Sequence, residues 1–258
     1  MTTAHQSPCR AGPVAPWGGL RFGDGARSNC RHFVGNHSLI ESLSGQYAGK
    51  PVRYFAGARR SFVEDLPQNP QARLLEIGCG NGDTAAYARE TGRCSLCVGV
   101  ELCPAPAAEA ATKLDVVLTG DIETLELPFP EEHFDVLILS EVLEHLRDPW
   151  ATLSRLRPLL KPGAVVLAGS PNVAHHSVLW MMLSGRWDYS PGGVMDKTHL
   201  RWFTPITYRE LFEGCGYVVE YVGPAAPLRW KARCFDLLTL GRMRHLLHTQ
   251  TYLRARRG

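Results

Sequence analysis

Residues 75–83, which read Leu-Glu-Ile-Gly-Cys-Gly-Asn-Gly-Asp, constrain the fold of this chain more than any other segment. They overlap the end of an apolar run over 73–77 that predicts a strand, and they precede a helical pattern over 85–89. Glycines between a strand and a helix permit a tight turn and let a ligand approach the backbone closely. The segment therefore predicts the first strand, binding turn and helix of an α/β domain.

The same alternation continues along the chain. Strands are predicted at 96–101, 115–118, 134–140, 164–169, 217–222 and 251–256. Helices are predicted over 105–113, 148–160, 206–214 and 230–248. Alternating strands and helices imply a mostly parallel sheet with helices on both faces, so the predicted fold class is doubly wound α/β.

The length of 258 residues suits one large domain with appendages. Residues 1–35 are rich in glycine and proline without a period, which indicates a flexible or lid arm. Residues 36–69 are predicted to be a helical segment, because apolar positions recur at helical spacing over 52–66. The main domain is then 70–258, with an insert at 170–204.

Composition limits the partners and the location of the chain. No uncharged apolar run approaches the roughly 20 residues of a membrane span, and no signal-peptide layout is present, so we expect a cytoplasmic protein without stable membrane insertion. From Gly223 onward eight arginines or lysines face one acid. Such a segment fits a solvated helix face, which is the favoured interpretation, or peripheral contact with anionic lipid, nucleic acid or an acidic substrate. No aromatic-interleaved basic motif indicates nucleic acid, and no pattern indicates an oligomeric state.

The eight cysteines suggest neither disulfides nor zinc. Cys94 and Cys97 are three positions apart at the strand expected over 96–101, and if both lie in that strand their side chains point to opposite faces. Such a pair could not easily bind one ion. We expect reduced, mostly buried cysteines and no metal site.

Three carboxylates follow successive predicted strands or stand beside the glycine turn. Glu76 suits the ammonium of an amino acid better than a pyrophosphate, and Asp83 stands where a nicotinamide-binding turn would need its third glycine. Glu101, at the end of the second strand, is placed to accept from ribose hydroxyls. Asp121 and the apolar Ile122 are placed to meet an adenine ring.

With these residues the chain resembles the class I S-adenosylmethionine-dependent methyltransferases. The resemblance lies in LEIGCGNGD at 75–83, the acid at 101, GDIE at 120–123, FDVLILSEVLEHLRDP at 134–149 and LLKPGAVVLAGSPN at 159–172. It implies a seven-stranded Rossmann-like sheet with one antiparallel strand, for which 251–256 is the candidate. It also implies S-adenosyl-L-methionine as cofactor, bound by Glu76, Gly78, Cys79, Gly80, Asn81, Gly82, Glu101, Leu102, Asp121, Ile122, Ser140 and Glu141.

The acceptor is expected to bind at the insert, because a sheet of this kind builds its second pocket after the fifth strand. Ser140-Glu141-Val142-Leu143 replaces the Asn-Pro-Pro-Tyr type of motif, which argues against methylation of bases or glutamine amides. The expected pocket residues are His145, Trp187, Tyr189, Asp196 and Arg201.

A histidine is the expected general base, because an acceptor hydroxyl must lose its proton near the transition state. His199 is favoured: Asp196 could fix its tautomer, while Lys197 and Arg201 would keep its pKa from rising. His176 and His175 follow as candidates, and each of the three could instead be a structural loop histidine.

The reaction predicted is methyl transfer to a small molecule, with a hydroxyl of a sugar or another metabolite as the leading acceptor. The insert resembles those of methyltransferases found with glycan-assembly enzymes, and the chain has a looser likeness to the methionine-biosynthesis protein MetW. Its Glu-His-Leu and Asp-Pro elements, at 144–146 and 148–149, resemble those of quinone O-methyltransferases. Because these relatives differ in acceptor, two alternatives stay open. One is a MetW-like partner that regulates an acyltransferase without catalysis, and the other is a quinone or lipid O-methyltransferase.

Overall fold

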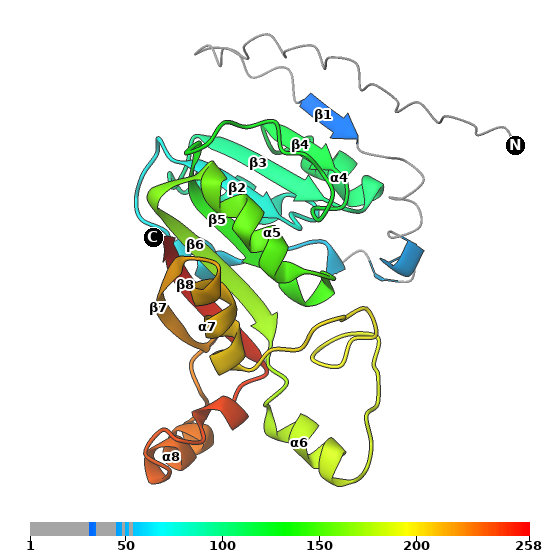
Figure 1. Cartoon of the computed structure of the whole chain (residues 1–258), viewed down its shortest axis with the longest axis vertical. Coiled ribbons are helices and arrows are strands. Elements are labelled where there is room, and N and C mark those ends of the chain that lie inside the picture. The colour runs from blue at the N-terminus through cyan, green and yellow to red at the C-terminus, as the bar shows by residue number, and fades with distance from the viewer. Residues whose placement is uncertain (1–30, 35–44, 48–49, 52–53) are drawn as a thin grey trace, which may run out of the picture.

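Eight strands form one sheet in the computed structural model, which describes residues 31–34, 45–47, 50–51 and 54–258 (Figure 1). Their order is β1-β4-β3-β2-β5-β6-β8-β7. The strands are β1 (Arg31–Val34), β2 (Arg73–Ile77), β3 (Leu96–Glu101), β4 (Val116–Thr119), β5 (Phe134–Ser140), β6 (Leu160–Pro171), β7 (Tyr217–Pro224) and β8 (Gln250–Arg257). All neighbouring pairs are parallel except those of β8, which is antiparallel to β6 and β7. The doubly wound α/β fold with one antiparallel strand is confirmed.

Helices connect the strands where the sequence pattern placed most of them. They are α2 (Arg60–Glu64), α3 (Asp83–Glu90), α4 (Pro104–Ala110), α5 (Pro149–Leu156), α6 (His176–Leu183), α7 (Pro205–Gly214) and α8 (Trp230–Leu238). Short 3-10 turns lie at Gly45–Tyr47, Leu143–His145, Arg157–Leu159 and Arg244–Leu246. Thr204 opens α7 with a capping box, in which its hydroxyl accepts from the amide of Thr207 at 3.2 Å.

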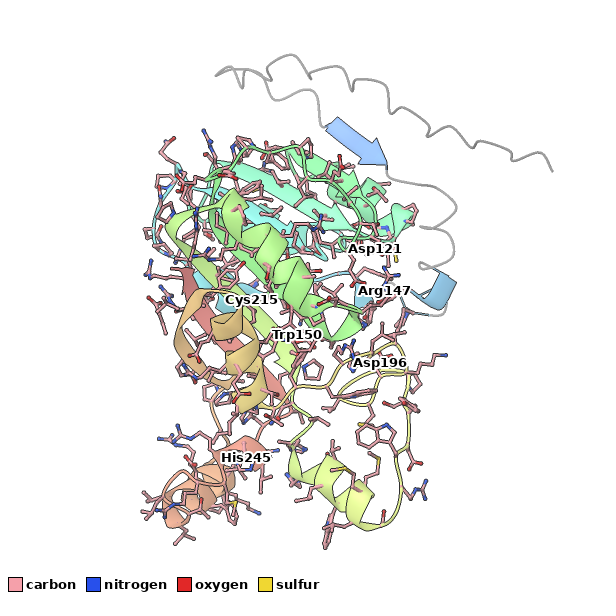
Figure 2. All side chains as sticks on the ribbon, in the orientation of Figure 1. Asp121, Arg147, Trp150, Asp196, Cys215 and His245 are labelled. Atoms are coloured by element: carbon pink, nitrogen blue, oxygen red, sulfur yellow. The ribbon has the colours of Figure 1, made fainter. Side chains whose placement is uncertain are left out.

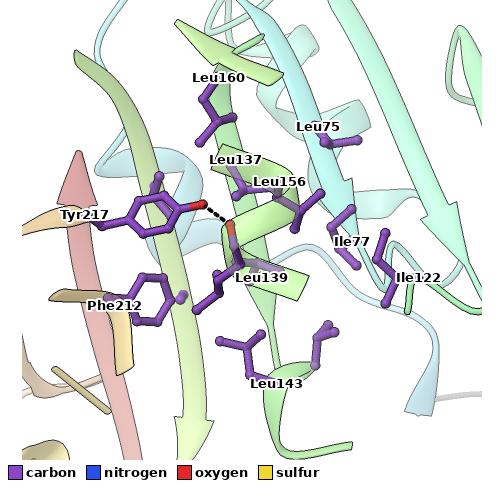
Figure 3. Packing of buried hydrophobic residues seen from close by; sticks show 14 of the residues in the cluster. Leu75, Ile77, Ile122, Leu137, Leu139, Leu143, Leu156, Leu160, Phe212 and Tyr217 are labelled. Atoms are coloured by element: carbon purple, nitrogen blue, oxygen red, sulfur yellow. Dashed lines mark hydrogen bonds between the residues drawn. The ribbon is translucent and has the colours of Figure 1, made fainter. Parts of the chain in front are cut away.

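The sheet separates two apolar layers, because successive side chains of a strand point to opposite faces. Leu75 and Ile77 pack with Leu156 of α5 and Phe212 of α7 on one face (Figure 3). Leu74 packs with α3, α4 and α2 on the other face. Both layers are fully buried around the central strands, so the carboxyl ends of β2, β3, β4 and β5 are held at one edge of a rigid sheet.

The segment before β2 differs from the predicted helix over 52–66. Among the described residues only Arg60–Glu64 is helical there, and Val52 lies outside them. Gly57 has φ 102°, and its amide donates to Oδ2 of Asp83 at 2.7 Å, while the carbonyl of Phe55 accepts from the amide of Asn81 at 2.9 Å. The prediction is wrong because these backbone groups bind the glycine turn instead of one another.

The first 35 residues contain a strand that no pattern indicated. β1 pairs in parallel with β4 and adds an eighth strand at the sheet edge. Residues 1–30 and 35–44 lie outside the described part of the chain, so the predicted arm and the domain boundaries stay predictions.

One further prediction needs correction. The helix expected over 230–248 ends at Leu238, because Leu240 and Gly241 have φ 52° and 76°, which a helix cannot contain. Strand β3 begins at Leu96 as expected, so Cys94 precedes it, and the Sγ atoms of Cys94 and Cys97 lie 3.4 Å apart. The insert also holds a helix, α6, that no sequence pattern indicated.

Candidate functional site

A cavity of about 540 Å³ lies at the carboxyl ends of β2, β3, β4 and β5. Residues after all four strands line it, together with residues from the N-terminal segment 47–59 and from the insert. Figure 2 shows Asp121, Arg147 and Asp196, which all line this cavity, along the same side of the molecule. In an open α/β sheet this is the edge at which ligands bind.

The glycine turn forms one wall of the cavity. Gly78, Gly80 and Gly82 have φ of 68°, 52° and 77°, a region that side chains with a Cβ rarely adopt. A Cβ on Gly78 would also lie 2.6 Å from Cγ2 of Val142, and one on Gly80 would collide with the carbonyl of Phe55. Gly78, Cys79 and Gly80 line the cavity, whereas Asn81 and Gly82 shape the turn from behind.

Glu101 is fixed at the end of β3 by backbone donors. Its Oε2 accepts from the amide of Gly80 at 2.8 Å and its Oε1 accepts from the amide of Cys103 at 2.9 Å. Burial raises the pKa of Glu101 above its usual value, although these hydrogen bonds oppose the rise. Each oxygen keeps a second lone pair, so the carboxylate can still accept from a vicinal diol. Leu102 lines the cavity next to it.

Glu76 is buried below the turn. Its Oε2 accepts from the amide of Ala85 in the first turn of α3 at 3.1 Å. Burial raises the pKa of Glu76 to about 8, with the positive charge of Arg59 opposing the rise. A carboxylate held in so apolar a place favours a cationic ligand, since the cation restores its charged form.

The end of β4 supplies Asp121 and Ile122. Oδ2 of Asp121 accepts from Nη2 of Arg147 at 2.7 Å, and Nε of Arg147 donates to Glu123 at 2.9 Å. Arg147 therefore holds the loop after β4 against the turn after β5. Arg147 is not among the predicted site residues, and its only signal in the sequence is its position in the stretch that follows β5.

The loop after β5 supplies Ser140 and Glu141, which both line the cavity. Glu141 has φ 58°, an unusual conformation for a residue with a side chain, and such outliers concentrate at functional sites. Burial raises the pKa of Glu141, while the positive charge of Arg59 opposes this.

The N-terminal segment closes the cavity from the other side. Tyr47, Tyr54 and Arg59 line it, and the ring centroids of the two tyrosines are 6.2 Å apart. The ammonium of Lys50 forms a buried ion pair with Asp196 of the insert. Sequence patterns could not find these residues, because only the folded chain brings residues 47–59 next to 193–200.

Two histidines and a glutamate form the far end of the cavity. The rings of His145 and His199 have centroids 4.8 Å apart, and one nitrogen of each lies within 4.8 Å of the other and of a carboxylate oxygen of Glu144. The amides of Leu200 and Arg201 donate to the carbonyl of Glu144 at 2.8 and 3.0 Å, which joins the insert to the turn after β5.

Backbone carbonyls fix the tautomer of both histidines. Nδ1 of His145 lies 3.2 Å from the carbonyl oxygen of Thr198, and Nδ1 of His199 lies 3.1 Å from that of Val194. A carbonyl oxygen only accepts, so each Nδ1 carries a proton and each neutral ring keeps a lone pair on Nε2. Burial lowers the pKa of His145 to about 4, with His199 adding to the effect, and burial also lowers the pKa of His199. Both rings are therefore neutral at physiological pH.

Glu144 is buried beside them. Burial raises its pKa well above the usual value, and the charge of Glu141 adds to the rise, which favours the neutral carboxyl. Glu144, His145 and His199 are also the one group of three in the described part of the chain whose ligand atoms could hold a metal ion. That no metal takes part stays a prediction.

Asp196 and Arg201 do not act on His199 as expected. Oδ1 of Asp196 accepts from the amide and hydroxyl of Thr198 at 3.0 and 2.9 Å, while its Oδ2 binds Lys50. Arg201 donates to the carbonyl of Arg147 and is absent from the cavity lining. The tautomer of His199 is therefore set by a backbone carbonyl, and its pKa is lowered by burial.

Four other expected site residues lie outside the cavity lining. His175 caps α6, since its Nδ1 accepts from the amide of Ser177 at 3.3 Å, and Nδ1 of His176 lies 2.9 Å from the carbonyl of Leu246. Trp187 and Tyr189 pack against Trp202, with ring centroids at 5.5 and 6.3 Å. These four residues therefore lie apart from the cavity, and catalytic or acceptor-binding roles for them stay predictions.

Comparison with known proteins agrees with this site. A ubiquinone biosynthesis O-methyltransferase of Saccharophagus degradans is 27% identical over 165 residues, which cover 57% of this chain and 67% of that protein. A 27-O-demethylrifamycin SV methyltransferase of Amycolatopsis mediterranei is 33% identical over 110 residues, 40% of each chain. The chain thus matches between two fifths and two thirds of the length of these two curated relatives.

Solved structures share the fold at low identity. An S-adenosylmethionine-dependent methyltransferase from Mesorhizobium loti has a TM-score of 0.55 at 17% identity, covering 80% of this chain and all of that one. One from Archaeoglobus fulgidus has a TM-score of 0.54 at 20% identity, covering 86% of this chain and 95% of that one. The sequence model of the family described as methyltransferase domain matches residues 51–222, which include every strand end of the cavity. The chain therefore belongs to the S-adenosylmethionine-dependent methyltransferases.

Proposed function

We propose that this chain transfers a methyl group from S-adenosylmethionine to a hydroxyl group of a small molecule. One observation carries the proposal. The same cavity is lined by the glycine turn and acids that suit the cofactor and by two neutral histidines, His145 and His199. The names of the two curated relatives support an oxygen acceptor, since one is an O-methyltransferase and the other acts on a 27-O-demethyl compound.

The cofactor would lie along the ends of β2, β3 and β4. Glu76 suits its ammonium, and Arg59, which also lines the cavity and whose charge lowers the pKa of Glu76, suits its carboxylate. Glu101 would accept from the ribose hydroxyls, and Asp121 with Ile122 would meet the adenine. Bound there, the cofactor supplies a methyl group on a sulfonium that is already activated for displacement.

The proton of the acceptor hydroxyl would go to Nε2 of His199. His199 would take this proton as the acceptor oxygen approached the methyl group that the bound cofactor would supply, and the thioether formed from the sulfonium would be the leaving group. A general base works best when its pKa lies near the working pH. His145, with its pKa lowered to about 4, is the weaker base of the two, which favours His199 and leaves His145 to position it.

The acceptor proposed is a hydroxylated ring compound, with sugars as the leading class. Tyr47 and Tyr54 offer aromatic faces in the cavity, and such faces pack well against sugar or aromatic rings. Lys50, held by Asp196, lies with its ammonium 4.8 Å from the centroid of the Tyr54 ring and fixes that face of the cavity.

The test is a transfer assay with labelled S-adenosylmethionine and fractionated metabolites, followed by a panel of hydroxylated sugars and phenols. The proposal predicts label on an oxygen atom of the product, and transfer by the Glu101→Ala variant that needs a higher concentration of S-adenosylmethionine. Label on nitrogen or carbon would contradict it. Tight binding of S-adenosylhomocysteine without transfer to any acceptor, together with co-purification of an acyltransferase, would favour the MetW-like alternative instead.

A further inference from the structure

Helix α8 has its apolar stripe on the outside. Trp230, Leu237 and Leu238 are 69%, 76% and 83% exposed, and Cys234 is exposed between them. These positions follow the i, i+4, i+7, i+8 spacing of one helix face, which a surface helix normally turns toward the core. The buried side of the helix carries an acid instead: Oδ2 of Asp236 accepts from Nη2 of Arg244 at 2.7 Å. The apolar face of α8 therefore points to solvent, and the side with Asp236 faces the rest of the protein.

A second apolar tip lies at the same end of the molecule. Trp180 and Leu183 of α6 are 71% and 67% exposed, and Figure 1 shows α6 and α8 projecting together beyond the sheet, at the end opposite to β1. Hydrogen bonds join the start of α6 to the turn at Arg244–Leu246, which follows α8: Nδ1 of His176 lies 2.9 Å from the carbonyl oxygen of Leu246, and Nδ2 of Asn172 donates to the carbonyl of His245 at 2.7 Å. We call the exposed side chains of α6 and of residues 229–243 the distal face.

The charge of the distal face has one sign. Arg229, Lys231, Arg233 and Arg242 are exposed and interleaved with the apolar residues. From Arg229 to the end of the sequence the one acid is Asp236, which is buried and already bound by Arg244. The region therefore presents apolar side chains within a field of positive charge.

We propose that the distal face docks on the surface of an anionic phospholipid bilayer. Apolar side chains among arginines and lysines suit the headgroup boundary, where the rings and leucines enter the acyl region and the cations meet lipid phosphates. The centre of a protein interface, by contrast, is depleted of charge and of lysine in particular. No helix in the described part of the chain is long and apolar enough to cross a membrane, so the contact is peripheral. The inference goes beyond the proposed methyl transfer and does not depend on it.

Sedimentation with lipid vesicles tests the proposal. The full chain should bind vesicles of phosphatidylcholine mixed with phosphatidylglycerol, bind weakly to phosphatidylcholine alone, and be released by salt. Leu237→Ser with Leu238→Ser should weaken binding about tenfold or more, because two exposed leucines no longer enter the acyl region. Lys231→Glu with Arg233→Glu should also weaken it about tenfold or more. Ile206→Ser, which changes an exposed apolar residue of α7 outside the distal face, should bind as the unchanged chain does.

A second measurement reports whether the distal face is the part of the protein that meets the vesicle. A polarity-sensitive dye on the exposed Cys234, in a variant with Cys9 and Cys30 replaced by serine, should shift to the blue with anionic vesicles and stay unchanged with neutral ones. Binding that is absent, or that survives both double variants, would overturn the proposal. A dimer in solution that the leucine variant separates would also overturn it, because a second copy would then cover the face.

Discussion

The two halves of the cavity differ in how their residues are distributed along the chain. The cofactor half is built from short stretches, each directly after a strand of the sheet, and its acids are fixed by nearby backbone amides such as that of Gly80 on Glu101. The acceptor half is assembled from distant segments: Lys50 pairs with Asp196, and His145 meets the carbonyl of Thr198. The first half is therefore a property of the fold, whereas the second depends on the contacts between the N-terminal segment and the insert.

The largest expected effect is in the acceptor half. His199→Ala should lower kcat by about 10²- to 10⁴-fold, the usual range for loss of a general base. Because burial lowers the pKa of His199, activity of the unchanged protein should fall only at a pH below the usual histidine range, and this acid limb should vanish in the variant. The pH–rate profile with the identified acceptor measures both.

His176→Ala is the matched control, since His176 lies outside the cavity lining. Its kcat should stay within about twofold of the unchanged protein. If the two variants lose activity equally, or if the acid limb survives in His199→Ala, the base is not in this half of the cavity.

The next effect concerns Glu76 in the cofactor half. With its pKa near 8 in the free protein, Glu76 must lose a proton to meet the ammonium of the ligand, so binding of S-adenosylhomocysteine should release protons at pH 7. Affinity should rise by up to about tenfold per pH unit below pH 8. Calorimetry in buffers of different ionisation enthalpy measures this release, and Glu76→Gln should abolish it.

The same variant tests how the raised pKa of Glu76 changes the stability of the protein with pH. A carboxyl group whose pKa is higher in the folded protein than in the unfolded chain adds to the free energy of unfolding at a pH below its unfolded pKa. This contribution is lost as the pH rises through the pKa of the folded protein. Glu76→Gln should therefore raise the Tm of the ligand-free protein above pH 8, by a few degrees, while it weakens ligand binding. A lower Tm at that pH would show that Glu76 is charged and well paired in the free protein.

A smaller effect is expected at the contact between the two segments. Asp196→Asn should raise KM for the acceptor several-fold, because Lys50 no longer holds the tyrosine segment against the insert. In the double variant with Lys50→Met, the rise in KM, expressed as a free energy, should be smaller than the sum of the rises in the two single variants. Asp188→Asn, which alters the exposed pair with Arg186, is the control and should leave KM unchanged. Additive losses would show that the pair does not act as a unit.

The smallest effect is expected at Trp187. The structure packs it against Trp202 outside the cavity, so Trp187→Ala should change kcat by less than about threefold and lower the free energy of unfolding by about 1 kcal/mol. Thermal or denaturant unfolding measures the second value. A large loss of kcat at unchanged stability would restore Trp187 as an acceptor-binding residue.

The sequence predicted what local patterns encode. Strand and turn periodicity found the central strands and placed Glu76, Glu101 and Asp121 together, because the ends of parallel strands meet at one edge. It could not find Tyr54, since the segment that holds it is shaped by hydrogen bonds to the glycine turn and not by its own periodicity. His199 was named for its charged neighbours, but the structure fixes it through the carbonyl of Val194, a long-range packing result that no local pattern carries.

Calorimetric titration with S-adenosylhomocysteine tests most directly whether the two halves have separate roles, and it needs no acceptor. The unchanged protein should bind in the micromolar range, about −8 kcal/mol. Glu101→Ala should weaken binding by about 1.5 to 3 kcal/mol, because it removes hydrogen bonds to a charged group, whereas His199→Ala should leave the affinity unchanged. Equal weakening in both variants, or none in Glu101→Ala, would contradict the division of the cavity into a cofactor half and an acceptor half.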